Sequence, residues 1–129
     1  MSVVNIEDFS RRAGLPGSLE LAFLGDSIYD LYVRARLIQK GGRMKQLNSE
    51  AVKRVRASAQ SAAFEHIEPL LTETEFAVAR RARNAKQTAP RSADPADYQR
   101  ATALEAVLGF LYVTGQIERM EELIREALT

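Results

Sequence analysis

The sequence predicts an all-α protein, a compact bundle of about six helices. Apolar residues recur at helical spacing along most of the chain, and capping residues and glycines divide it into segments of helical length. No stretch alternates between apolar and polar residues as a half-buried strand does. The 129 residues fit one domain over residues 1–129, because a typical domain has about 100–150 residues.

The first predicted helix runs from Leu19 to about Lys40. Ser18 is a suitable N-cap, and Gly41 and Gly42 can end the helix in left-handed backbone geometry. This segment is apolar nearly all round, a pattern typical of a helix that its neighbours cover on most sides. We therefore expect it at the centre of the bundle.

A second, amphipathic helix is predicted from about Asn48 to His66. Its expected buried stripe consists of small or apolar residues at helical spacing, namely Val52, Val55, Ala59, Ala62 and Ala63. Lys53, Arg56 and Gln60 fall outside the stripe. His66 is the only histidine of the chain, and we interpret it as a helix-end residue rather than a catalyst.

Three further helices are predicted after residue 66. Thr72 and Glu75 have capping-box spacing, which assigns Glu75 a structural role at the start of a helix that runs to about Lys86. The stretch 87–93 contains a proline and reads as an exposed loop. Asp94 as N-cap and Pro95 at the first helical position open the next helix, which ends near residue 115, and a last helix covers about residues 118–128.

Composition excludes several classes of site and points to one class of partner. Without cysteine there is no disulfide, thiolate metal site or cysteine nucleophile, and without a leader or a long apolar run we expect a cytoplasmic protein and no membrane partner. The net charge is only +1, but residues 34–100 hold 14 of the 18 basic residues and only 7 of the 17 acidic ones. Residues 76–93 hold five basic residues and no acid. This segment is either a solvated helix face or a surface for a phosphate-rich partner.

Two acidic residues lie where a helix should be buried. Asp26 and Glu105 are flanked by apolar residues, and a carboxylate in such a place is costly unless something satisfies it. A shared cation would satisfy both, and oxygen ligands without thiols favour magnesium or manganese over zinc. The small residues Ala22, Gly25, Ala101 and Gly109 lie within about a turn of these acids and would let the two helices approach.

A purely structural interpretation of the acids remains open at this point. Each carboxylate could accept hydrogen bonds or pair with an arginine inside the bundle. Asp30, one turn after Asp26, could be an outer acid of a metal site or could pair with Arg34 at the next turn.

Three segments of the chain together resemble a known family. LAFLGDSIYDLYVRARL looks like the signature helix of ribonuclease III catalytic domains, and LEAVLGFLY resembles their second acidic helix. The intervening RRARNAKQTAPRSADPADYQR is similar to the compact bacterial branch, Mini-ribonuclease III. The resemblance runs from about Leu15 to the C-terminus and implies the all-α ribonuclease III endonuclease fold.

The resemblance also implies a catalytic centre. Asp26 and Glu105 match the two central catalytic, metal-binding acids, with Mg²⁺ or alternatively Mn²⁺ as the ion. Two further acids of the larger enzymes are replaced here by Ala22 and Thr102, a reduction shared with the compact branch. We expect Thr102 and Asp30 to lie in an outer layer around the metal.

The resemblance further implies a homodimer that cuts double-stranded RNA to leave 5′-phosphates, without a separate RNA-binding domain. The expected substrate is the precursor of 23S ribosomal RNA, with a ribosomal protein as a possible helper and no DNA substrate. Candidate RNA contacts lie between Asp26 and Glu105 in the sequence, namely Arg81, Arg83, Asn84, Lys86, Thr88, Arg91, Tyr98 and Arg100. The alternative is a non-catalytic RNA-binding or ribosome-associated module on the same fold. For the dimer face we expect the helix 19–37, with Tyr29 and Tyr32 as contributors.

Overall fold

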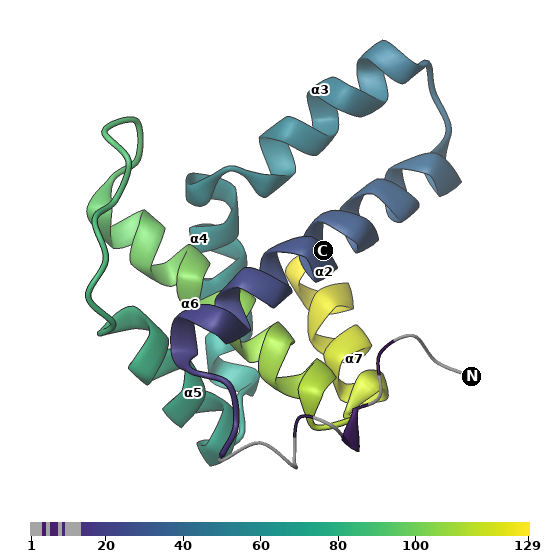
Figure 1. Cartoon of the computed structure of the whole chain (residues 1–129). Helices are drawn as coiled ribbons and strands as arrows, with labels where there is room; N and C mark the ends of the chain where they lie inside the picture. Colours follow the sequence, from purple (N-terminus) through teal and green to yellow (C-terminus); the bar gives the residue numbers. More distant parts are fainter. Residues whose placement is uncertain (1–3, 5, 8, 10–13) are drawn as a thin grey trace.

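The computed structural model of the chain is a helical bundle (Figure 1) and describes residues 4, 6, 7, 9 and 14–129. Among these residues there are no strands, and the predicted all-α class is confirmed. The helices are α2 (Ser18–Lys40), α3 (Met44–Val55), α4 (Ala57–Ile67), the short 3-10 helix η1 (Glu68–Leu70), α5 (Glu73–Arg83), α6 (Pro95–Val113) and α7 (Ile117–Ala127).

Helix α6 occupies the centre of the bundle and packs against α2, α4, α5 and α7. Leu104, Leu108 and Leu111 on α6 have no exposed surface. The expectation that the segment 19–40 is the central helix was wrong, because α2 covers only one side of α6 and leaves Phe23 and Leu31 exposed. Among the described residues, α2 and α6 have the length to cross a bilayer, but neither is apolar enough to do so.

Two glycines allow α2 and α6 to approach closely. A Cβ atom on Gly25 would lie 1.7 Å from the backbone oxygen of Glu105, and one on Gly109 would lie 2.0 Å from the backbone oxygen of Leu21. Real Cβ atoms do not come so close to other atoms, so both positions must lack a side chain. The predicted role of small residues in bringing these two helices together is confirmed.

The helix predicted from about residue 48 to residue 66 is in fact two helices. The chain leaves helical geometry at Arg56, where φ is −66° and ψ is 154°, and so separates α3 from α4. The break also changes which residues are buried: Val52 is 63% exposed, whereas Gln60 is only 3% exposed. The predicted stripe was wrong at these two positions and also at Ala62, which is exposed, because one helical period does not run through the break.

Helix ends otherwise follow the capping residues, with small shifts. Thr72 and Glu75 form the predicted capping box, with Glu75 Nα–H donating to Thr72 Oγ1 (3.2 Å) and Thr72 N–H donating to Glu75 Oε1 (2.9 Å). Asp94 caps α6, as predicted, by accepting a hydrogen bond from the Asp97 backbone. The N-cap of α2 is Gly17 rather than Ser18, and Gly41 ends that helix with the predicted positive φ, 85°.

Candidate active site

A cleft with a volume of about 380 Å³ lies where α2 and α6 meet the α3–α4 junction. Both predicted acids, Asp26 of α2 and Glu105 of α6, line it. The other lining residues are Leu19, Ala22, Phe23, Val55, Ala57, Gln60, Gln87, Tyr98, Ala101 and Thr102. The close approach of α2 and α6 thus brings together two carboxylates that are far apart in the sequence.

The two carboxyl groups lie within hydrogen-bonding range of each other. Burial and, to a smaller extent, the neighbouring Asp26 together raise the pKa of Glu105 to about 9, although the Gln60 amide opposes the rise. No Lys or Arg among the described residues forms an ion pair with either acid, so the interpretation that each acid pairs with an arginine is wrong for this part of the chain. The acid pair faces the cleft without a compensating positive charge.

The structure does not bring the other titratable candidates into the cleft. Asp30 pairs with Arg34 at 3.1 Å, as one of the two sequence interpretations held, and does not line the cleft. His66 lies in the last turn of α4, as predicted, with Nε2 3.5 Å from a carboxylate oxygen of Glu126. Within the described ranges, no cluster of three or more His, Cys, Asp or Glu residues forms a metal site. The carboxylates that line the cleft and could hold a metal ion are those of Asp26 and Glu105.

Thr102, one turn before Glu105, connects the cleft to the loop between α5 and α6. Its side chain is 4% exposed, and its hydroxyl donates to the Tyr98 carbonyl (2.9 Å) and accepts from Gln87 Nε2 (3.0 Å). Ala22 lies one turn before Asp26 and also lines the cleft. The start of the loop is thereby held against the helix that carries Glu105.

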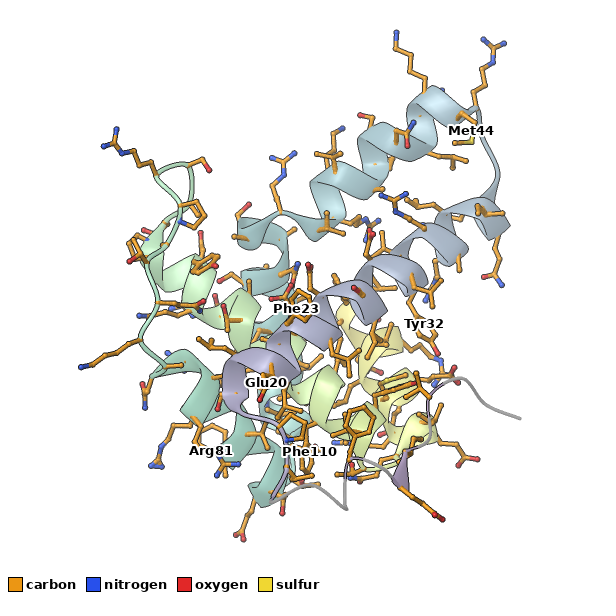
Figure 2. The ribbon with its side chains drawn as sticks, viewed as in Figure 1. Glu20, Phe23, Tyr32, Met44, Arg81 and Phe110 are labelled. Carbon is orange, nitrogen blue, oxygen red and sulfur yellow. The ribbon has the colours of Figure 1, made fainter. Side chains whose placement is uncertain are left out.

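The candidate RNA contacts fall into three groups. Five of them, namely Arg81, Asn84, Lys86, Thr88 and Arg91, are exposed at the end of α5 or in the loop that follows it, and Figure 2 shows Arg81 projecting away from the body of the molecule. Tyr98 is half-buried and lines the cleft itself. The other two arginines are engaged within the chain, Arg83 with Glu68 at 3.7 Å and Arg100 with Ser61 at 3.4 Å.

Gln60 is a buried polar residue of the cleft that the sequence interpretation missed. It was placed outside the buried stripe, yet its side chain is buried beside Glu105. A signal was present, because Gln60 stands among small and apolar residues in ASAQSAAF, where a polar side chain has few solvent-facing positions.

Comparison with known proteins decides the family. The Ribonuclease III domain profile matches residues 19–116. The chain belongs to the ribonuclease III family. Two curated relatives named Mini-ribonuclease 3 show the branch: one from Symbiobacterium thermophilum is 48% identical (84% of this chain, 85% of the relative), and one from Brevibacillus brevis is 42% identical (94% and 92%). A crystal structure of a Fusobacterium nucleatum protein superimposes with a TM-score of 0.79 at 37% identity and 84% coverage of both chains.

Membership in this family makes the chain an endoribonuclease of the Mini-ribonuclease III branch. The predicted family and enzyme class are confirmed. The alternative of a non-catalytic RNA-binding module on the same fold is not supported, since the relatives named above are ribonucleases.

Proposed function

We propose that this endoribonuclease cuts double-stranded RNA with a divalent metal ion held by Asp26 and Glu105. The observation that supports the proposal most strongly is the acid pair itself: two carboxylates from different helices share one cleft, and no described basic side chain pairs with them. Two carboxylates held close together in one cleft without a counter-charge repel each other unless a proton or a cation compensates them. Carboxylate oxygens favour Mg²⁺, with Mn²⁺ as an alternative.

The bound metal would activate a water molecule and neutralise charge on the scissile phosphate. The residues of the chain determine where this happens. Asp26 and Glu105 would hold the ion at the cleft surface, and the glycine contacts between α2 and α6 fix the spacing of these carboxylates. We expect products with a 5′-phosphate and a 3′-hydroxyl.

The RNA duplex would be held by the basic segment at the end of α5 and in the following loop. Lys86 and Arg91 are exposed there and have no ion pair among the described residues, so they are free to contact phosphates. The Gln87–Thr102 hydrogen bond holds the start of this loop beside the cleft, which supports phosphate contacts near the acids. Because duplex RNA is recognised mainly by its shape, phosphates and 2′-hydroxyls, we expect low sequence specificity and no cleavage of duplex DNA.

We also propose a homodimer formed through α2. Phe23 and Leu31 on this helix are 83% and 64% exposed, and large apolar side chains so exposed are typical of contact surfaces when they lie together. Figure 2 shows Phe23 on the outer face of α2. The expected contribution of Tyr29 to the dimer face was wrong, because that residue is 2% exposed. The hydroxyl of Tyr32 donates to Glu121 of its own chain. Sedimentation showing only a 14.4 kDa monomer at micromolar concentration would contradict the dimer.

The natural substrate we propose is the duplex stem at the ends of the 23S ribosomal RNA precursor, with a ribosomal protein as a helper. Cleavage of this stem should then be faster than cleavage of an unrelated duplex of equal length when ribosomal proteins are present. Equal rates on both duplexes under all conditions would argue against this substrate.

The direct test of the proposed function is cleavage of a long RNA duplex by the purified protein. With Mg²⁺ the duplex should be cut to fragments that carry 5′-phosphates, and chelation of the metal should stop the reaction. A DNA duplex of the same sequence should stay intact. Duplex binding without cleavage in both Mg²⁺ and Mn²⁺ would contradict the proposal.

A further inference from the structure

The Gln60 side chain spans the junction between α3 and α4. Its Nε2 atom donates to the backbone carbonyl of Val55, the last residue of α3, at 2.8 Å. That carbonyl needs a donor from elsewhere, because the chain leaves helical geometry at Arg56. The amide nitrogen of Gln60 therefore has a fixed acceptor on one side.

The same amide lies against the catalytic cleft. Gln60 and Glu105 line the same cleft, and the Gln60 amide acts on the Glu105 carboxyl group as a donor that lowers its pKa. A primary amide nitrogen carries two N–H groups, so one can donate to Val55 while the other is directed at Glu105. Turning the amide over would place its oxygen against the Val55 carbonyl oxygen, which repels it, so the amide has one favoured orientation.

This orientation leaves the other end of the amide without a partner. Gln60 Oε1 is buried and forms no hydrogen bond with any described residue. A buried polar atom without a partner destabilises a fold, whereas an apolar side chain of similar size at this position would not carry that cost. The cost of this unsatisfied oxygen is explained if the protein needs both N–H groups of the glutamine, one at the helix junction and one at Glu105.

We propose that Gln60 is a positioning residue that fixes the Glu105 carboxylate opposite Asp26 for metal binding. This inference rests on the proposed metal-dependent function. Gln60 does not hold the ion itself, because its nitrogen faces the carboxylate and its oxygen is enclosed by protein. It orients a ligand, as outer-layer hydrogen-bond donors do in many metal sites. Through Val55, it also ties that ligand to the junction between α3 and α4.

The test measures the affinity of the RNA-free protein for Mn²⁺, from the loss of the free-ion signal in electron paramagnetic resonance. Replacing Gln60 by methionine keeps the length of the side chain but removes both donors, and should weaken Mn²⁺ binding about tenfold or more. Ser61→Ala is the matched control, because Ser61 is an equally buried polar residue on α4 whose hydroxyl contacts Arg100. This control should retain wild-type affinity for Mn²⁺.

A double variant shows whether Gln60 acts through Glu105. Adding Gln60→Met to Glu105→Gln should weaken Mn²⁺ binding no further than Glu105→Gln alone, because the residue that Gln60 orients has already lost its charge. Equal Mn²⁺ affinity of wild type and Gln60→Met would overturn the inference. Absence of Mn²⁺ binding by the wild-type protein would instead contradict the proposed function.

If Gln60→Met does not fold, the wild-type protein provides the measurement. In an NMR titration with Mg²⁺, the side-chain amide protons of Gln60 should shift with the same midpoint as metal binding. Amide resonances that stay unchanged while the metal binds would overturn the inference.

Discussion

Replacing Gly25 by alanine should separate α2 from α6 without altering any polar group of the active site. The added Cβ would lie 1.7 Å from the Glu105 backbone oxygen, whereas an ordinary contact is at least 3.4 Å. The two helices must therefore move apart by more than about 1.5 Å, or bend locally. Since the contacted atom belongs to the backbone of Glu105 itself, the Glu105 carboxylate should move away from Asp26.

The expected loss of stability follows from two opposing effects. Forcing a methyl group into a packed interface typically costs about 1–3 kcal/mol, and this contact is severe enough for the upper end of that range. Alanine is a better helix former than glycine by about 1 kcal/mol, which offsets part of the loss. The net loss of about 2 kcal/mol should lower the melting temperature by about 6–10 °C.

The effect on catalysis should be larger than the effect on stability. At a temperature where Gly25→Ala is fully folded, its rate of duplex cleavage should fall about a hundredfold, because a displacement near 1 Å can cost that much. Gly109→Ala should act in the same direction, since its Cβ would meet Leu21 at 2.0 Å. Ser27→Ala is the control, because Ser27 is exposed on the same helix. Its free energy of unfolding should lie within about 0.5 kcal/mol of the wild-type value. Wild-type melting and wild-type cleavage by Gly25→Ala would refute the argument that backbone contact sets the carboxylate spacing.

Three further predictions concern the RNA surface, an ion pair and pH. Lys86→Ala should weaken duplex binding and lower the slope of its salt dependence by about one. Arg83→Ala should change this slope less, because Arg83 is already paired with Glu68 within the chain. Equal slopes for the two variants would contradict this difference. Arg119→Leu should destabilise the protein by about 3 kcal/mol in chemical denaturation, because it leaves the buried Glu75 carboxylate without its partner at 2.9 Å. Burial raises the pKa of Glu75, but the hydrogen bonds from Arg119 and Thr72 and the charge of Arg119 together outweigh burial and lower it. This carboxylate should therefore stabilise the fold at neutral pH, and its contribution should be lost as the pH falls through the lowered pKa. The pKa of Glu105 is raised to about 9, so the metal-free protein should lose stability as the pH rises from the ordinary carboxyl range toward 9, and Glu105→Gln should remove that part of the loss.

Much of the fold could be predicted because its determinants are local. Capping residues such as Thr72 and Asp94 act on their own helix, and each lies where the sequence placed it. The glycines of the two acidic helices indicated the close approach of α2 and α6, since few other reasons explain small residues in an apolar helix. The all-α class, and the expectation that Asp26 and Glu105 lie on two closely packed helices, could therefore be predicted from local sequence features.

The errors arose where tertiary contacts decide the structure. The break at Arg56 has no proline or glycine to indicate it, and Gln60 satisfies the free carbonyl at the break from the next helix. Burial of Gln60 and exposure of Val52 both follow from that break. The same holds for α2. Its apolar composition is compatible with a central helix, but it equally suits a helix that leaves apolar side chains such as Phe23 exposed for a second copy.

The most direct test of the account is duplex cleavage by Asp26→Asn and Glu105→Gln. Both substitutions keep the shape of the side chain and remove its charge, so each should abolish cleavage of a long RNA duplex in Mg²⁺, and the double variant should be no worse than either single one. Binding of the duplex in Ca²⁺ should stay close to wild type, because RNA contacts are assigned to the basic segment after α5. Full cleavage by either single variant, with normal duplex binding, would contradict the claim that this pair of carboxylates is the catalytic metal site.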